Sequence, residues 1–323
     1  MRFLIFGGAG YLGSHLVDLL DFTENEIVVF DNRSGNISTS FSSNVKFVFG
    51  DITNPASVKE LDQFGKFDGV FHLAALKSVE QSFLRKDAYA LVNETGTVNI
   101  AKYCKDKGIR NIVFSSSAAV YGALDSPTLI SEDDLTKPIN PYGLNKLNAE
   151  NVLRELSTSS SINVMTLRLF NLVGAAKPEY NDLRGENVLP VIARKLMGGE
   201  LFKVFGNSYP TTDGTCVRDY INVLDVAMAH VMAMNFLIHN KFTGSSHTLN
   251  VCSGTGFSIL ELITLVNKVN KNHLSWVFGN ERLGDPASVI GDNSRAKETL
   301  GWIPKIKMET SITESLSLGG TFE

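Results

Sequence analysis

The chain has 323 residues, 43% of them hydrophobic and 20% charged, with a formal net charge of -4, and this is enough for one large domain or two packed lobes. Because it has no basic run and no stretch of about 20 apolar residues, the sequence predicts neither nucleic-acid binding nor a membrane span. Its three cysteines are far apart and in no metal-like spacing, which predicts a reducing, cytoplasmic setting without a disulfide framework or a metal site.

Strand-like and helix-like segments alternate through the first half of the chain. Short apolar runs predict strands, and segments with helical periodicity predict the helices between them. This alternation is typical of βαβ units, so it predicts an α/β fold with a Rossmann-type, doubly wound parallel sheet. The predicted strands are 2–6, 26–30, 45–50, 69–75, 111–117 and 162–171, and the predicted helices are 14–20, 89–107 and 141–156.

The second half of the chain is more irregular. It predicts helices at 187–197, 223–237 and 258–269, a strand at 247–254 and a turn-rich loop at 207–219. We therefore expect a Rossmann domain of residues 1–171 and about 219–254. A smaller mixed α/β lobe is expected from about 172–218 and 255–323.

A glycine-rich turn, GGAGYLG at residues 7–13, follows the first predicted strand and opens a helix. Glycines permit the sharp turn and the close approach of a pyrophosphate, which the helix N-terminus favours, although a plain βα turn would also be glycine-rich. Asp31 follows the second predicted strand, where a carboxylate accepts hydrogen bonds from ribose hydroxyls and repels the extra phosphate of NADP. The pattern favours NAD, a preference that Arg33 weakens slightly. Asp51 and Ile52 would suit the adenine edge.

Tyr142 and Lys146 lie four residues apart in a predicted helix and therefore share one face. The lysine charge can stabilise a phenolate and lower the tyrosine pKa, which would make Tyr142 a general base. The same pair also occurs by chance on surface helices. Ser115, Ser116 and Ser117 strengthen the catalytic interpretation, because they end the fifth predicted strand, where ligands sit in an open α/β sheet.

Six motifs carry a resemblance to a known family: GGAGYLGSH, HLAALKSVEQS, FSSSAAVYG, PYGLNK, VFGNSYPTTDGTCVRDYINVLDVA and RLGD. In this order and spacing, from residue 1 to about 304, the chain resembles the UDP-glucose 4-epimerases of the extended short-chain dehydrogenase/reductase superfamily. The resemblance implies an NAD-dependent isomerase that inverts C4 of a UDP-hexose through a transient 4-keto sugar. It also implies that the smaller lobe binds the nucleotide sugar.

Site roles come from the same resemblance, position by position. The catalytic residues would be Ser117, Tyr142 and Lys146. Cofactor binding would involve Gly7, Gly10, Tyr11, Leu12, Gly13, Asp31, Asn32, Asp51, Ile52, Leu73, Ala74, Ala75, Lys77, Asn93, Ser115, Tyr142, Lys146 and Phe170. Substrate binding would involve Lys77, Ser117, Tyr142, Asn171, Asn187, Val188, Leu189, Phe205, Arg218, Arg282, Asp285 and Val289.

Some positions depart from the family pattern. Leu169 and Leu172 stand where the family commonly has tyrosine and proline, which leaves the exact sugar open. Val289 is small where a bulky tyrosine is associated with exclusion of N-acetyl groups, so we hypothesise that UDP-N-acetylhexosamines also fit. A 4-epimerase for pentose or uronic-acid sugars remains an alternative.

Two further alternatives are a nucleotide-sugar dehydratase and a non-catalytic NAD-binding module. Ala118 and Ala119 stand where a dehydratase would carry acidic residues, and a sensor has no need for a general base. The resemblance also implies a homodimer that pairs through segments of about 86–106 and 142–157. An apolar stripe on these helices could equally pack on the sheet.

Overall fold

The structure is a computed structural model that describes residues 1–23, 25–34, 41–123, 129–181, 187–240, 242–270, 272–282 and 285–316. It divides into two compact units. Unit 1 comprises Met1–Gly122, Thr136–Arg168 and Ala227–Leu249, and unit 2 comprises Ala123–Leu135, Leu169–Val226 and Asn250–Glu323. The last residues of the predicted smaller lobe, 317–323, lie outside the described residues.

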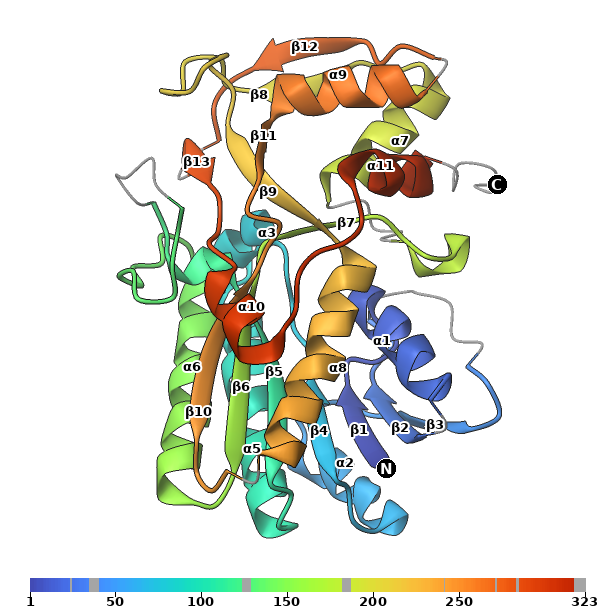
Figure 1. Ribbon diagram of the computed structural model, residues 1–323, viewed down its shortest axis with the longest axis vertical. Coiled ribbons are helices and arrows are strands. Elements are labelled where there is room, and N and C mark those ends of the chain that lie inside the picture. The colour runs from blue at the N-terminus through green and yellow to red at the C-terminus, as the bar shows by residue number, and fades with distance from the viewer. Residues whose placement is uncertain are drawn as a thin grey trace. The chain divides into compact units, whose positions relative to one another are not determined.

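Unit 1 is built on a seven-stranded sheet in the order β10-β6-β5-β4-β1-β2-β3 (Figure 1). The pairs β1–β2, β1–β4, β2–β3 and β4–β5 are parallel. The chain therefore reverses direction across the sheet beside β1, and the predicted doubly wound Rossmann sheet is confirmed. Such a reversal leaves a crevice at the carboxyl ends of the strands, where dinucleotides bind in this architecture.

The elements of unit 1 follow the sequence pattern closely, with only a few end residues of β6, β10 and α8 falling in unit 2. The strands are β1 (Arg2–Phe6), β2 (Glu26–Asp31), β3 (Val45–Phe49), β4 (Gly69–His72), β5 (Asn111–Ser117), β6 (Asn163–Leu169) and β10 (Ser246–Val251). The helices are α1 (Tyr11–Asp21), α2 (Pro55–Lys59), η1 (Glu60–Phe64), α3 (Val79–Leu84), α4 (Lys86–Ala90), the π-helix η2 (Leu91–Thr95), α5 (Gly96–Asp106), η3 (Ala118–Val120), α6 (Pro141–Ser159) and α8 (Val223–His239).

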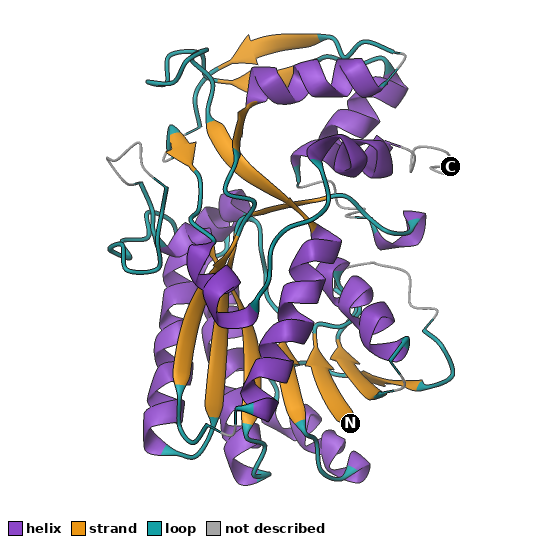
Figure 2. Cartoon of the chain, viewed as in Figure 1, coloured by secondary structure: helices purple, strands orange, loops and turns teal. Residues whose placement is uncertain are grey.

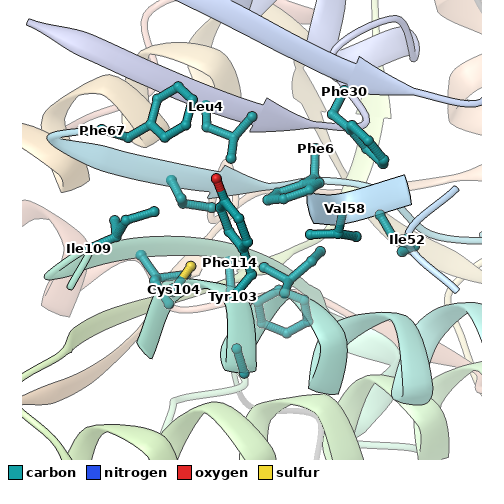
Figure 3. Close-up of a cluster of buried hydrophobic side chains, with 14 of the residues drawn as sticks. Leu4, Phe6, Phe30, Ile52, Val58, Phe67, Tyr103, Cys104, Ile109 and Phe114 are labelled. Atoms are coloured by element: carbon teal, nitrogen blue, oxygen red, sulfur yellow. The ribbon is translucent and has the colours of Figure 1, made fainter. Parts of the chain in front are cut away.

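Central strands of this sheet are apolar on both faces because helices cover both faces. One face meets α2, α5 and α6, whose side chains join the strand residues in a buried cluster (Figure 3). Phe6 and Phe30 meet edge to face in this cluster, with ring centroids 5.4 Å apart. The other face packs against α8, where Met234 lies so close to Gly69 of β4 that a Cβ there would come within 2.4 Å of its sulfur. Figure 2 shows this layering of helix, strand and helix.

Unit 2 combines small sheets with its own helices. In its main sheet β9 is central, pairing with β7, β11 and β13, while β8 and β12 form a parallel pair. The strands are β7 (Asn171–Val173), β8 (Phe202–Phe205), β9 (Val217–Asn222), β11 (Gly256–Ser258), β12 (Trp276–Gly279) and β13 (Ser288–Val289). The helices are η4 (Pro178–Tyr180), α7 (Val188–Gly198), α9 (Ile259–Val269), α10 (Ser294–Leu300) and α11 (Met308–Leu316). Leu189, Leu262 and Ile312 from three of these helices share one core.

The boundaries of the two units differ from the predicted lobes in several places. Ala123–Leu135, expected in the Rossmann domain, belong to unit 2, and the segments of unit 1 end at Arg168 and Leu249 rather than at 171 and about 254. The largest difference is at one return of the chain. We expected the chain to rejoin the Rossmann domain at about 219, whereas unit 1 resumes at Ala227. The reason is β9, which pairs with β7, β11 and β13 rather than with the large sheet. Within the described residues, no helix is long and apolar enough to cross a membrane.

Candidate active site

The glycine-rich turn between β1 and α1 is shaped by close backbone contacts. Gly7 has a φ of +84°, and a Cβ at this residue would lie 2.5 Å from the amide nitrogen of Ala74. A Cβ at Gly13 would lie 2.3 Å from the Gly7 carbonyl oxygen. At Gly10 the nearest atom to a Cβ is again that oxygen, at 3.3 Å, so this position faces more open space. The turn therefore leaves room for a ligand at Gly10, immediately before the N-terminus of α1.

Asp31 ends β2 beside this turn. Its carboxylate accepts hydrogen bonds from the backbone nitrogens of Ala9 (3.0 Å) and Arg33 (2.6 Å). Burial raises the pKa of this carboxyl, and the two backbone donors oppose the increase. The Arg33 guanidinium lies 4.4 Å from the centre of the Phe47 ring. The Asp31 carboxylate, on which the predicted preference for NAD rests, thus lies at the turn. The Arg33 guanidinium, which would weaken that preference, stacks on the Phe47 ring.

Asp51 and Ile52 follow β3. Asp51 accepts a hydrogen bond from the Thr53 nitrogen (2.8 Å), and the Ile52 carbonyl accepts one from the Asn99 side chain (2.8 Å). The Ile52 side chain is buried against Gly96 of α5, where a Cβ would lie 2.5 Å from its Cδ1. These contacts fix the backbone at the end of the third strand.

Leu73, Ala74 and Ala75 follow β4, and the chain continues to Lys77. Leu73 and Ala74 donate backbone hydrogen bonds to the Phe6 carbonyl, each at 2.9 Å. The Asn93 amide both accepts from the Leu76 nitrogen and donates to the Leu76 carbonyl, each at 2.9 Å. The Lys77 ammonium lies 5.7 Å from the centre of the Tyr11 ring, above the glycine-rich turn. Asn93 therefore holds the backbone next to Lys77.

The structure differs from the predicted helix at 89–107 in the region of Asn93. The structure has α4, the π-helix η2 and α5 in succession, with Asn93 in the π-helical turn. A π-turn changes the direction of side chains relative to the α-helix and is frequent at functional sites. Here it coincides with the side chain that grips the Leu76 backbone.

Tyr142, Ser117 and Lys146 come together at the end of β5. Asn140 accepts a hydrogen bond from the Gly143 nitrogen (2.8 Å) as the cap of α6, so the helix begins just before Tyr142. The hydroxyl of Tyr142 is hydrogen-bonded to Ser117. The Lys146 ammonium donates to the Ser115 carbonyl (2.8 Å) and lies 4.9 Å from the Phe114 ring centre.

The ionisation of this pair differs from the simple expectation. Burial raises the pKa of Tyr142, with the Ser117 hydrogen bond opposing the increase, whereas we expected Lys146 to lower that pKa. The physical reason is that Tyr142 is itself buried, which disfavours the charged phenolate. The Lys146 ammonium, hydrogen-bonded to a backbone carbonyl, is buried as well. Burial lowers its pKa to about 7, and the Glu150 carboxylate opposes the decrease.

Sequence reasoning missed three residues that shape this cluster. Gly143 lets α6 approach η3, because a Cβ there would lie 2.3 Å from the Ala119 carbonyl oxygen. Glu150 and Arg168 form a buried ion pair at 2.8 Å next to the serines of β5. A glutamate four residues after Lys146 and an arginine inside an apolar strand were the available signals, since buried charges need partners.

Unit 2 holds most of the predicted substrate residues, and several of them meet around β9. Arg218 forms an ion pair with Asp285 and lies opposite Val289 in the register of β9 and β13. Arg282 stacks over the Phe205 ring, with its guanidinium carbon 4.0 Å from the ring centre. Unit 2 thus holds two arginines, one carboxylate and one aromatic ring in two contacting pairs, and guanidinium groups are suited to binding phosphate.

The remaining predicted residues of unit 2 are more scattered. Asn171 in β7 donates its side-chain amide to the Asp219 carbonyl (3.2 Å). Phe170 is buried against Gly291. Asn187 precedes α7 as its cap residue, and Val188 begins that helix. The Leu189 side chain is fully buried in the core of unit 2, so only its backbone can face a ligand.

No cluster of His, Cys, Asp or Glu suited to a metal ion occurs among the residues that the structure describes. Cys104, Cys216 and Cys252 are all free and buried.

Comparisons with known proteins agree with this architecture. A sequence profile described as the NAD dependent epimerase/dehydratase family matches residues 3–252. A UDP-glucose 4-epimerase of Bacillus subtilis is 38% identical over 330 residues, which cover 98% of this chain and 96% of that protein.

Solved structures are similar over almost the whole chain. A UDP-glucose-4-epimerase from Stenotrophomonas maltophila, solved with bound NAD and formylated UDP-arabinopyranose, superimposes with a TM-score of 0.91 at 34% identity, covering 99% of this chain and 98% of that one. The UDP-Glc/GlcNAc 4-epimerase of Campylobacter jejuni has a TM-score of 0.83 at 33% identity, with 98% of each chain covered. Together with the parallel sheet and the glycine-rich turn, these matches show that the chain belongs to the NAD dependent epimerase/dehydratase family.

Proposed function

We propose that this protein is an NAD-dependent epimerase that interconverts UDP-hexoses differing at C4, such as UDP-glucose and UDP-galactose. The observation that carries the proposal is the group of Ser117, Tyr142 and Lys146 at the end of β5, two strands from the glycine-rich turn that follows β1. An alcohol-oxidising site needs a general base and a place for a dinucleotide, and unit 1 offers a tyrosine beside a lysine and a glycine-rich turn at the N-terminus of α1. Relatives called UDP-glucose 4-epimerases support the choice of substrate.

NAD fits the residues of unit 1. The open space at Gly10 and the N-terminus of α1 suit the pyrophosphate, and Asp31 suits the adenosine ribose. Asp51 and Ile52 would border the adenine, Asn32 and the backbone of 73–75 would line the pocket, and Lys77 would approach the phosphates. When bound, NAD supplies the acceptor and donor for the hydrogen at C4 of the sugar and a positive ring charge that favours a phenolate nearby.

The protein side chains would manage the proton of the reacting hydroxyl. Tyr142 takes the proton from the 4-hydroxyl as the sugar is oxidised to a 4-ketose, and it returns that proton when the sugar is reduced on its other face. Ser117 orients the same oxygen through its hydroxyl. Lys146 stabilises the phenolate while Tyr142 is deprotonated. Every group ends as it began, so the overall reaction is an isomerisation.

Unit 2 would hold the nucleotide while the ketose turns over. Arg218 and Arg282 would grip the diphosphate, since guanidinium groups bind phosphate oxygens in pairs. Phe205 would border the uracil, and Asp285 would reach the uridine ribose. Asn171, Asn187 and the start of α7 would complete the contacts. A firm hold on the nucleotide leaves the sugar free to present either face.

A second substrate class is UDP-N-acetylhexosamine. Val289 is a small residue that lies opposite Arg218 in the strand pairing, so it stands close to the proposed diphosphate grip. A small side chain there would leave space for an acetamido group. The similar protein from Campylobacter jejuni, described as a UDP-Glc/GlcNAc 4-epimerase, supports this broader range.

We also propose a homodimer and a cytoplasmic location. Leu91 of η2 and Val98 of α5 are 50% and 45% exposed and lie seven residues apart, and Leu144 of α6 is 48% exposed. Helices α5 and α6 pack against each other, so apolar side chains on both would form a single surface for a second copy. The free cysteines fit a reducing compartment.

The proposal is tested by incubating the purified protein, without added NAD, with UDP-glucose and UDP-N-acetylglucosamine, and following the anomeric protons by NMR. We expect signals of UDP-galactose, and of UDP-N-acetylgalactosamine if the Val289 argument holds. The Tyr142→Phe variant is the control, because it should retain the fold and lose turnover. If neither product forms even after NAD is added, the proposed reaction is wrong and pentose and uronic-acid sugars are the next substrates to test.

A further inference from the structure

Helix α6 meets the serines of β5 through three side chains spaced by one helical turn. Tyr142 is hydrogen-bonded to Ser117, Lys146 donates to the Ser115 carbonyl, and Glu150 accepts a hydrogen bond from Ser116 (2.5 Å). Residues four apart lie on one helix face. The proposed base and its lysine are therefore followed on the same face by a carboxylate that the mechanism has not yet used.

The Glu150 carboxylate is buried and hydrogen-bonded. It is 4% exposed and accepts two hydrogen bonds from Arg168, from Nε at 3.1 Å and from Nη2 at 2.8 Å. Arg168 is 6% exposed, donates to the Tyr121 hydroxyl at 3.0 Å, and lies 4.8 Å over the Tyr121 ring. The carboxylate therefore has strong donors on both oxygens, a guanidinium and a hydroxyl, which hold it in one position.

Lys146 needs such an anion because its own surroundings disfavour its charge. It is 4% exposed, and its ammonium has a carbonyl and an aromatic face as neighbours. Burial lowers its pKa to about 7, with Glu150 opposing. The titratable and charged groups around it are Tyr142 and Glu150 on α6, His72 on β4, Arg168 on β6, His230 on α8, Tyr89 on α4 and Glu94 on η2.

His72 and Glu94 do not supply the missing charge. Burial and the charge of Lys146 lower the pKa of His72 to about 3, so that its ring is neutral. Glu94 is engaged with the side chains of Asn145 and Asn148 on α6 (Asn148 at 2.9 Å). Glu150 is left as the carboxylate whose field acts on Lys146.

We propose that Glu150, held in place by Arg168 and Ser116, is a positioning residue that keeps the remaining proton of the Tyr142–Lys146 pair on the lysine. This inference rests on the proposed function. Once the pair has lost one proton, the remaining proton resides in one of two places. It is either on Lys146, which leaves a reactive Tyr142 phenolate, or on Tyr142, which leaves an inactive phenol. A nearby anion stabilises the first arrangement, and each unit of lysine pKa changes the ratio of the two about tenfold.

The test combines Glu150→Gln with two matched variants. Glu150→Gln keeps the shape and an acceptor for Ser116 but removes the charge. Arg168→Gln removes the partner that offsets the carboxylate, so it should act on Lys146 in the opposite direction. Glu94→Gln removes another carboxylate that is hydrogen-bonded to α6, and it is the control. Ser116→Ala is the mildest change, since it leaves the charge of Glu150 and removes one donor.

The main readout is the titration of Lys146 in protein labelled with carbon-13 at lysine Cε, with the signal identified by its loss in Lys146→Met. We expect the pKa of Lys146 to fall by about one unit in Glu150→Gln, to rise in Arg168→Gln, to rise slightly in Ser116→Ala, and to stay unchanged in Glu94→Gln. In parallel, kcat for UDP-glucose should fall about tenfold in Glu150→Gln with little change in KM.

Two results would overturn the proposal. One is a Lys146 titration that stays at its original pH in Glu150→Gln while the melting temperature falls, which would make the ion pair purely structural. The other is a Lys146 pKa that shifts in the same direction in Glu150→Gln and in Arg168→Gln. If these two variants do not fold, a Lys146 pKa that falls in Ser116→Ala overturns the proposal instead. Absence of turnover in the unmodified protein would refute the proposed function alone, because the NMR titration needs no turnover.

Discussion

Replacing Gly10 by alanine separates the folding role of the glycine-rich turn from its proposed role in binding. Gly10 has a φ of −83°, which alanine adopts without strain, and an added Cβ would meet only the Gly7 carbonyl oxygen, at 3.3 Å. The stability should therefore change by no more than about 1 kcal/mol, the usual scale for a helix cap residue. The methyl group would instead occupy the space proposed for the pyrophosphate.

Gly13→Ala provides the contrast. Its Cβ would lie 2.3 Å from the Gly7 oxygen and 2.7 Å from the Gly8 Cα, so the turn itself must shift, at a cost of about 1–3 kcal/mol. For Gly10→Ala, losing one charge-assisted hydrogen bond to phosphate, about 1.5–3 kcal/mol, would weaken NAD binding roughly 10- to 100-fold. Calorimetric titration of the NAD-free protein and denaturant unfolding measure the two effects. A folded Gly10→Ala that binds NAD as tightly as the unmodified protein would refute the reasoning.

Three further changes test the remaining parts of the proposal. Tyr142→Phe should lower kcat by about 10²–10⁴-fold while bound NAD, read from absorbance, is retained, and equal loss of both would argue against a general base. Val289→Tyr should abolish turnover of UDP-N-acetylglucosamine and spare UDP-glucose in the NMR assay, so unchanged N-acetylated turnover would contradict the pocket argument. Leu91→Arg should convert a dimer to a 35.3 kDa monomer in sedimentation, whereas Leu201→Arg, an exposed residue of unit 2, should not.

Much of the fold could be predicted because its signals are local. The strands of unit 1 are short buried apolar runs, and the glycine-rich turn has one physical use at a strand-to-helix junction. The order of strands beside β1 follows once the βαβ units are recognised. The return of the chain at Ala227 could not be predicted, because whether β9 pairs with the large sheet or with β7 depends on contacts distant in the sequence.

The candidate site shows the same limit. Spacing alone brought Tyr142 and Lys146 to one helix face, and in the structure a hydrogen bond with Ser117 counters the rise in the Tyr142 pKa. Spacing says nothing about burial, so it failed to foresee that the pKa of Tyr142 is raised. It also missed Glu150, because its partner Arg168 lies on a different element. Buried charges are recognised only when both members of the pair are placed.

The central claim, that C4 is inverted by removing and returning the same hydrogen, is tested most directly in deuterated water. The protein would be incubated with UDP-galactose in D₂O and the UDP-glucose formed would be examined by proton NMR at C4. The account predicts UDP-glucose that keeps a full hydrogen at C4, since only the hydroxyl proton, handled by Tyr142, exchanges with solvent. Deuterium at C4 would contradict it, because the carbon would then have exchanged its hydrogen with water.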